Sequence, residues 1–293
     1  MLMVQHVVLY YQTLPVPFLQ GDVEETGPPR FLCEKSWLMS GRERDLESIL
    51  YFLNSALRIP EFPDYEMALN GLQVDGTGPI RKIAVAVDAG VQTVEAAVAG
   101  GVDLLIVHHG IYWDGLQPMT GRRYQRVAPL IRAGTALYAA HLPLDAHPEM
   151  GNCVQLLHAL GLTPEERFGR FKDVDIGFTA SANEGREAFR RRVAEVVGGA
   201  VRLIEGGPAE VRKVGVVTGG GGSFVRAAAE AGLDTLLTGE GPHHTYLDAL
   251  EFGVNVLLAG HYSTETFGVR ALAASVEKRF GIPWEFLDFP SGL

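Results

Sequence analysis

The stretch that decides the fold is residues 82–109, "KIAVAVDAGVQTVEAAVAGGVDLLIVHH", because it occurs twice in related form. Residues 213–240, "KVGVVTGGGGSFVRAAAEAGLDTLLTGE", align with it without a gap and place Glu240 opposite His109. Each copy has an apolar run, a glycine turn, an alanine-rich segment, a second glycine turn and another apolar run. This order is typical of a βαβ unit, and continuous apolar strands indicate a sheet covered on both faces. The sequence therefore predicts an α/β fold.

A second pair of matching segments extends the repeat. "LYAAHLPLD" (137–145) aligns with "LLAGHYSTE" (257–265), so that each half gains a short strand followed by His-x3-acid. Residues 163–207 are predicted to form a short α+β segment, and no low-complexity linker separates the parts. We therefore expect two pseudo-repeated α/β halves, residues 41–162 and 163–293, that are closely packed or intertwined.

The composition is that of a globular chain with an acidic balance. Of the 293 residues, 47% are hydrophobic and 20% are charged, and the formal net charge is -10. Proteins that bind nucleic-acid backbones present clustered Lys and Arg, so we expect no nucleic-acid partner. The basic run "FRRRV" (189–193) lies in an amphipathic pattern and is predicted to be a solvated helix face.

The sequence carries no membrane or disulfide signal. No apolar run reaches the roughly 18 residues of a membrane span, so no membrane partner is expected. Cys33 and Cys153 lie far apart and form neither a disulfide framework nor a CxxC metal motif. This usage suits a reducing compartment, and we expect a cytoplasmic protein.

Residues 1–40 differ in character from the rest of the chain. They contain "PVP" and "GDVEETGPP" and lack the positive n-region and cleavage site of a signal peptide. Two interpretations stay open. The segment is either an N-terminal extension, disordered or created by a gene start placed ahead of Met39, or an arm that packs on a neighbour.

Polar side chains gather at four predicted strand ends. Seven of the nine histidines fall in "VHHG" (107–110), "AHLPLDAH" (140–147), "TGEGPHH" (238–244) and "GHYSTE" (260–265), together with three carboxylates. In open α/β sheets, ligands bind beyond the carboxyl ends of the strands. A single histidine after a strand is usually structural, but seven at matching strand ends, with carboxylates, indicate a metal site.

Imidazole and carboxylate are ligands of divalent transition metals, and a two-metal site needs a carboxylate that bridges the ions. With five or more ligands from both halves, we expect two such ions per chain in the crevice between the halves. Their identity stays open among Zn, Fe, Mn, Co and Ni. A structural role is also open for two of the carboxylates, because Asp145 suits a helix N-cap and Glu265 the first turn of a helix.

The glycine run "TGGGGSF" (218–224) follows a predicted strand and precedes a predicted helix. It matches neither a Walker A loop nor G-x-G-x-x-G. Backbone amides at a helix N-terminus can hold an anion, so an anion-binding loop and a plain tight turn are both open.

Five segments in this order resemble the Nif3-like family of dinuclear metal-centre hexameric proteins, often described as type-two GTP cyclohydrolase homologues. They are "NGLQV" (70–74), "HHG" (108–110), "HLPLD" (141–145), "TGE" with "HH" (238–244) and "GHYSTE" (260–265). The resemblance covers roughly residues 43–293, and the combination of segments is specific where each alone is weak.

The resemblance implies a two-part α/β protomer in a toroidal homohexamer, with two metal ions facing an interior cavity. Matched by position, it implies five metal ligands: His108, His109, Asp145, His261 and Glu265. It also implies that three further histidines surround the metals or contact substrate, namely His141, His243 and His244.

The expected function is a metal-dependent hydrolase of a nucleotide-like or phosphorylated small molecule, with GTP ring opening as the narrower form. Glu240, His243 or His244 would then transfer protons as catalytic residues. The alternative is a non-catalytic, metal-binding regulatory or chaperone-like hexamer, because the sequence contains no motif for a particular substrate.

Overall fold

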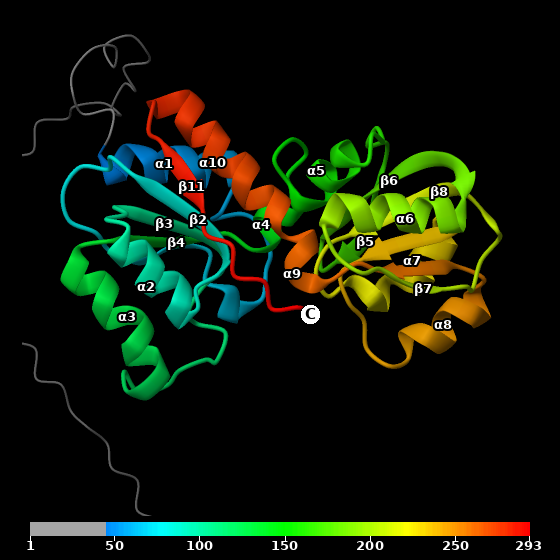
Figure 1. Ribbon diagram of the computed structural model, residues 1–293, viewed down its shortest axis with the longest axis horizontal. Coiled ribbons are helices and arrows are strands. Elements are labelled where there is room, and N and C mark those ends of the chain that lie inside the picture. Colours follow the sequence, from blue (N-terminus) through cyan, green and yellow to red (C-terminus); the bar gives the residue numbers. More distant parts are fainter. Residues whose placement is uncertain (1–44) are drawn as a thin grey trace, which may run out of the picture. The chain divides into compact units, whose positions relative to one another are not determined.

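The computed structural model describes residues 45–293, so the predictions for residues 1–40 lie outside the described residues. The described residues belong to one compact unit that contains two sheets. The α/β class and the two related halves predicted from the sequence are confirmed (Figure 1). The boundary between residues 162 and 163 stays a prediction.

The first sheet has the strand order β1-β4-β3-β2-β11. Its members are β1 (Gly71–Val74), β4 (Ala136–Ala139), β3 (Leu104–His109), β2 (Ile83–Asp88) and β11 (Trp284–Phe286). The last four run parallel, and β1 is antiparallel to β4. The carboxyl ends of β2, β3 and β4 therefore lie along one edge of the sheet, where ligands bind in such folds.

Helices cover both faces of this sheet, as its continuous apolar strands predict. Figure 1 shows α1 (Leu46–Leu57) and α10 (Thr266–Phe280) on one side, and α2 (Val91–Ala99) and α3 (Gly121–Ala133) on the other. The end of the chain thus returns to the first sheet, because α10 packs on β2 and β11 pairs with β2. The two halves are intertwined through this return.

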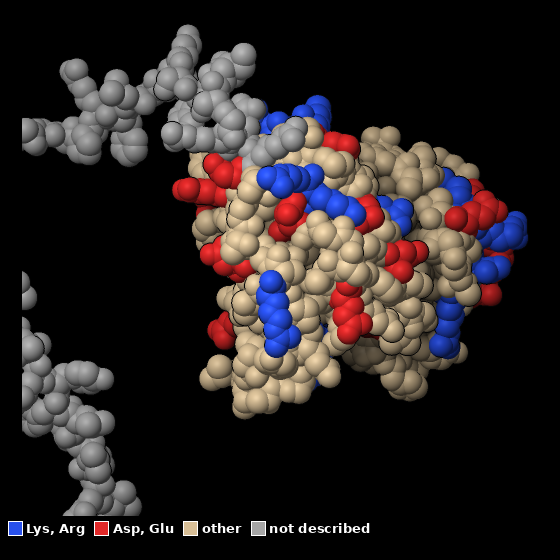
Figure 2. Space-filling model, turned by 60° about the vertical axis from the view of Figure 1, so that its left-hand side comes forward, with Lys and Arg blue, Asp and Glu red and all other residues tan. Residues whose placement is uncertain are grey.

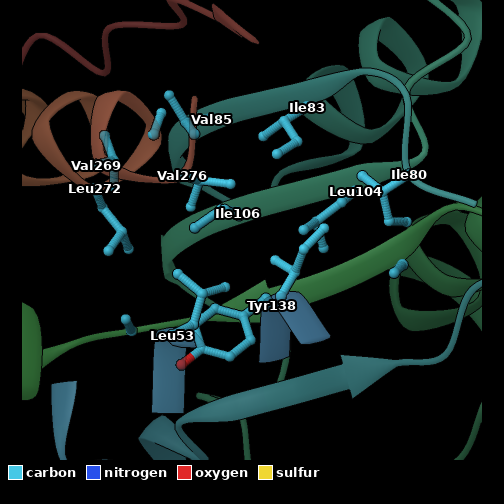
Figure 3. Packing of buried hydrophobic residues seen from close by; sticks show 14 of the residues in the cluster. Leu53, Ile80, Ile83, Val85, Leu104, Ile106, Tyr138, Val269, Leu272 and Val276 are labelled. Carbon is cyan, nitrogen blue, oxygen red and sulfur yellow. The ribbon is translucent and has the colours of Figure 1, made fainter. Parts of the chain in front are cut away.

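The core beneath α1 and α10 shows how strand alternation selects the buried face. Figure 3 shows Leu53 of α1 and Val276 of α10 in one cluster with Ile83 and Ile106 of the sheet, and none of these side chains is exposed. Full burial of each such side chain contributes about 1.5–3 kcal/mol. The alternate residues of the same strands, such as Ala84, belong to the cluster on the opposite face.

The second sheet has the strand order β5-β6-β8-β9-β10-β7. Its members are β5 (Arg167–Phe171), β6 (Val174–Gly185), β8 (Glu210–Val217), β9 (Thr235–Thr238), β10 (Asn255–Leu258) and β7 (Arg202–Ile204). The parallel strands are β8, β9 and β10, which correspond to β2, β3 and β4 of the first sheet. One face packs against α5 (Asn152–Ala159) and α6 (Arg186–Val197), the other against α7 (Val225–Glu230) and α8 (Thr245–Phe252).

The repeat extends to individual hydrogen bonds. Asp103 precedes β3 and accepts the backbone amides of residues 81 and 82 at 2.8 and 2.9 Å. Asp234, its aligned counterpart, precedes β9 and accepts the amides of residues 212 and 213, both at 2.9 Å. In each half, one carboxylate therefore ties the start of the second strand to the backbone just before the first strand or in its N-terminal half.

Short helices follow the last parallel strand of each half. These are α4 (Leu142–Asp145) after β4 and α9 (His261–Thr264) after β10, while η1 (Glu66–Ala68) and η2 (Gly221–Phe224) are 3-10 turns. Among residues 45–293, no helix is both long and apolar enough to cross a membrane. On the face drawn in Figure 2, acidic and basic side chains of the described residues lie interspersed.

Candidate metal centre

Histidine and carboxylate side chains from both halves meet beyond the carboxyl ends of the parallel strands. The five residues expected as ligands lie together, with His141 beside them: His108, His109, Asp145, His261 and Glu265. Three overlapping groups within this set each have ligand atoms that lie within 4.8 Å of one another. Segments far apart in the sequence therefore build one cluster at the edge that the strand order predicts.

His108 is fully buried at the end of β3, and its two ring nitrogens have different surroundings. Nδ1 lies 2.8 Å from the carbonyl oxygen of Ala140, to which it can only donate. Nε2 is then the nitrogen that can bind a metal ion when the ring is neutral. It faces Oδ2 of Asp145 at 3.3 Å and Oε1 of Glu265 at 3.5 Å.

Carboxylates hold the Nδ1 atoms of His109 and His261, and the Nε2 atom of each ring faces Glu265. Nδ1 of His109 lies 2.9 Å from Oδ1 of Asp88, the residue paired with it across β2 and β3. Nδ1 of His261 lies 2.8 Å from Oε1 of Glu240. A carboxylate on the outer nitrogen fixes the ring and makes the inner nitrogen a stronger ligand.

The fourth ring, His141, has its own buried carboxylate. Nδ1 lies 2.9 Å from Oδ1 of Asp64, whose Oδ2 accepts the amide of Leu142 at 3.0 Å and Nδ2 of Asn70 at 2.8 Å. Burial acts to raise the pKa of Asp64, but His141 and these hydrogen bonds lower it below its usual value. The sequence reasoning missed Asp64, which lies in a loop ahead of η1 with no motif around it.

Glu265 occupies the centre of the cluster. Its Oε1 lies 3.2 Å from Nε2 of His261 and 3.5 Å from Nε2 of His108, and its Oε2 lies 3.4 Å from Nε2 of His109. The residue is at the junction of α9 and α10, and its side chain forms no helix cap. This placement differs from the expected first helical turn, and it leaves both oxygens directed at imidazoles.

Asp145 presents one oxygen to the cluster because the other is already engaged. Oδ1 accepts from Nδ2 of Asn152 at 2.8 Å and from the hydroxyl of Thr218 at 2.9 Å, so Oδ2 is left for His108. Asp145 is the last residue of α4 and caps no helix N-terminus. Asn152 and Thr218 were not anticipated from the sequence, because neither was singled out as a partner of a strand-end histidine.

The residues present fit a transition-metal ion. Two ligands of one ion, each about 2.1 Å from it, lie about 3.0–3.4 Å apart in octahedral or tetrahedral geometry. The distances between imidazole Nε2 and carboxylate oxygen, 3.2 to 3.5 Å, match this spacing and are long for charge-assisted hydrogen bonds. Nε2 of His108 and Oε2 of Glu265 are buried without a hydrogen-bond partner, which a shared ion would provide.

The pKa shifts in the cluster indicate that its imidazoles hold protons, which a metal ion would have to displace. Burial alone would lower the pKa of His108, but the carboxylates of Asp145 and Glu265 raise it well above its usual value. Burial also opposes the charge of Glu265, yet the surrounding histidines lower the pKa of this carboxyl well below its usual range. Burial lowers the pKa of His261, but Glu265 and Glu240 overcome this effect and raise it to about 9. Metal binding must therefore release protons from these imidazoles.

The three residues expected to transfer protons lie at the margin of the cluster or outside it. Glu240 is exposed, and its carboxylate is engaged with His261. His243 and His244 are exposed residues just ahead of α8, and neither lines the cavity described below. The role of all three in proton transfer stays a prediction.

The glycine run packs against the cluster. The amides of Gly219, Gly221 and Gly222 already donate to oxygens of the protein. Gly219 has a φ of +62°, and a Cβ there would lie 2.0 Å from Oε1 of Glu265. The run is thus a tight turn that allows the backbone to approach the centre closely.

A cavity of about 770 Å³ opens beside the cluster. Its lining includes four of the expected ligands, His109, Asp145, His261 and Glu265, together with His141. Its volume is in the range of small-molecule sites, about 300–1,000 Å³. The cluster is therefore accessible to a molecule of that size.

Known proteins similar to this chain share nearly its whole described length. A relative from Deinococcus radiodurans is 47% identical over 249 residues, covering 84% of this chain and 94% of the relative. One from Halobacterium salinarum is 43% identical, covering 85% of this chain and all of the relative. Both carry the name GTP cyclohydrolase 1 type 2 homolog.

Solved structures agree with these relatives. The crystal structure of TTHA1606 from Thermus thermophilus is 40% identical, with a TM-score of 0.77 over 85% of this chain and 100% of that one. Reduced HcgD from Methanocaldococcus jannaschii is 26% identical, with a TM-score of 0.72 over 84% and 98% of the two chains. The family model described as Duf34/NIF3 (NGG1p interacting factor 3) matches residues 45–290, which confirms the resemblance, and the chain belongs to this family.

Proposed function

We propose that this protein is a metal-dependent hydrolase of a nucleotide-like or phosphorylated small molecule. The observation that carries the proposal is the arrangement around Glu265, whose two oxygens face the Nε2 atoms of His108, His261 and His109. A carboxylate so placed can bridge two ions, and two-metal centres of this composition are common in hydrolases. The cavity beside it is large enough for such a substrate.

Two divalent transition-metal ions would be held by the expected ligands. His108 and Asp145 form one group with Glu265, and His109 and His261 form a second group with the same carboxylate. When bound, such ions lower the pKa of a water molecule and polarise the group that it attacks. Zn, Fe, Mn, Co and Ni all accept this donor set.

Other residues of the chain orient these ligands and can transfer protons. Asp88 and Glu240 hold the outer nitrogens of two imidazoles, which fixes each ring and its tautomer. His141 lines the cavity and has its Nδ1 fixed by the ionised Asp64. Its Nε2 is therefore directed at the cluster and can accept or return a proton of the reacting group.

A narrower proposal follows from the names of the relatives, which are called GTP cyclohydrolase 1 type 2 homologs. For GTP, the reaction would be ring opening: water adds to C8 of the purine, a C8–N bond breaks, and the released nitrogen takes a proton from the water. The names support only the choice of GTP as a substrate to test.

The test is an activity screen of the full chain loaded separately with each candidate metal. The panel contains GTP, other nucleotides and phosphoesters, and product formation is followed by chromatography. The proposal predicts turnover with at least one metal and its loss in a His108→Ala, Glu265→Ala double variant. A metal-loaded wild type that turns over nothing would contradict it and would favour the alternative, a non-catalytic metal-binding regulatory or chaperone-like protein.

We also propose that the chain assembles with itself as a toroidal homohexamer. The support is the family resemblance, together with large apolar side chains that are exposed on α8, Tyr246, Leu247 and Leu250. Light scattering after size-exclusion chromatography tests this, and a mass of one chain would contradict it.

A further inference from the structure

One cation in the wall of the metal cavity has no partner in the part of the chain that the structure describes. Arg126, on α3, lines the cavity, and its side chain takes part in no hydrogen bond or ion pair there. Its Nε is buried without a partner. A buried guanidinium nitrogen without a hydrogen-bond partner lowers the stability of the protein. In a cavity wall, a bound ligand can supply the missing partner.

The acids near Arg126 are engaged elsewhere. Oδ1 of Asp114 accepts from Arg123, and Oδ2 accepts from Arg122 at 3.1 Å. Oδ1 of Asp88 is engaged with His109. Burial and the like charge of Arg122 both lower the pKa of Arg126, so an anion from outside would relieve an unfavourable environment.

Arg122 also lines the cavity, so two guanidinium groups one turn apart on α3 face the same space. Two carboxylates, Asp114 and Asp88, act on Arg126 by their charge, and two further arginines, Arg122 and Arg123, lie near it. The three arginines outnumber these two carboxylates, so this group of side chains carries a net positive charge. Guanidinium groups bind phosphate through several parallel hydrogen bonds, and a dianion suits such a pair better than a monoanion.

Aromatic side chains form a further part of the lining. Trp113 and Tyr65 lie 6.2 Å apart between ring centroids, and Phe171 lies 4.9 Å from Tyr65. Trp113 also contacts His141 edge-on at 4.7 Å, so the aromatic group reaches the metal cluster. Trp113 and Tyr65 are 37% and 52% exposed, which leaves ring surface free for stacking with a planar ligand.

We propose that Arg126 anchors the phosphate group of a phosphorylated, ring-bearing substrate, while Trp113 and Tyr65 stack on its ring beside the metal centre. This inference deepens the proposed function and rests on it, because the bound compound is a substrate only if the protein is a hydrolase. Arg126 is here a specificity-determining residue, because it selects the phosphorylated compound over its unphosphorylated form.

The test is direct binding by calorimetry, which requires no turnover. Nucleosides and their 5′-monophosphates are titrated into the full chain, both metal-free and metal-loaded, with malonate as a carboxylate probe. The variants are Arg126→Gln, Trp113→Ala and, as a matched control on the same helix, Arg132→Gln, which is exposed and does not line the cavity. Thermal unfolding checks each variant, and Arg126→Gln should not lower the midpoint because the Arg126 guanidinium bonds to nothing in the described chain.

The proposal predicts that wild type binds the monophosphate more tightly than the nucleoside. Arg126→Gln should weaken monophosphate binding about tenfold or more, which is the usual contribution of a charge-assisted hydrogen bond to affinity. It should leave nucleoside binding unchanged. Trp113→Ala should weaken both compounds, and Arg132→Gln neither. Equal affinity of Arg126→Gln and wild type for the monophosphate, preference for malonate, or no binding at all would overturn it. If the pattern holds but no metal-loaded protein turns over any compound, the anchor stands and the hydrolase proposal fails.

Discussion

The replacement Glu240→Gln separates two roles for this carboxylate. Oε1 of Glu240 lies 2.8 Å from Nδ1 of His261, so the structure makes Glu240 a residue that positions one of the expected metal ligands. The sequence reasoning expected it to transfer protons. Gln keeps an acceptor oxygen and the side-chain shape but removes the charge that strengthens the imidazole as a ligand.

The magnitude follows from the exposure of the pair. Loss of a residue that holds a metal ligand typically weakens metal binding about 10–100-fold. The Glu240 side chain is 53% exposed, so water screens its charge, and we expect the lower end of that range. The expected change is about tenfold in the dissociation constant, or about 1.4 kcal/mol, for the ion that His261 binds.

The assay is competition for metal with a chromophoric chelator at about pH 7.5, where neutral imidazole is available to the metal. Glu251→Gln serves as the matched control, because Glu251 is an exposed carboxylate at the end of α8 with no ion pair in the described chain. We expect weaker binding of one ion in Glu240→Gln, unchanged binding in the control, and turnover restored by excess metal. Unchanged metal affinity together with lost turnover would refute the positioning role and favour proton transfer.

Three further predictions concern the surroundings of the cluster. Asn152→Leu removes a hydrogen bond to Asp145 while nearly keeping the volume, and should weaken metal binding about 10–100-fold in the same chelator competition; wild-type affinity would contradict the role given to Asn152. Gly222→Ala places a Cβ 2.3 Å from Cα of Gly241 and should lower the free energy of unfolding by about 1–3 kcal/mol in urea titration; an unchanged midpoint would show that the turn can yield. In metal-free protein the pKa of His261 is raised from 6.5 to about 9, so its ion pairs stabilise fully below pH 6.5 and are lost as pH rises through 9; a urea midpoint that does not fall over this interval would disprove the sign.

The fold was predictable from the sequence because the repeat encodes the same βαβ unit in both halves. The apolar runs ahead of His109 and Glu240 are buried strands, and Asp103 and Asp234 make the same backbone ties in each half. The return of α10 and β11 to the first sheet was not predictable in detail. It depends on long-range packing, and the short strand of residues 284–286 carries no pattern of its own.

The candidate site was also predictable from the sequence only in part. Clustered histidines at strand ends predicted which side chains meet, because parallel strands end at one edge. The groups that orient them were missed for different reasons. Asp88 ends a strand within the opening repeat and pairs with His109 across the sheet, so the alignment contained its signal. Asp64 reaches His141 from 77 residues away, and sequence spacing does not record such a contact.

The most direct test of the central claim is the metal content of the full chain. The protein is purified without chelators and measured by elemental analysis against protein concentration, with the His108→Ala, Glu265→Ala double variant as control. We expect up to two transition-metal ions per chain in wild type and loss of metal in the double variant. Wild-type protein that takes up no transition metal, or a double variant with the same content, would contradict it.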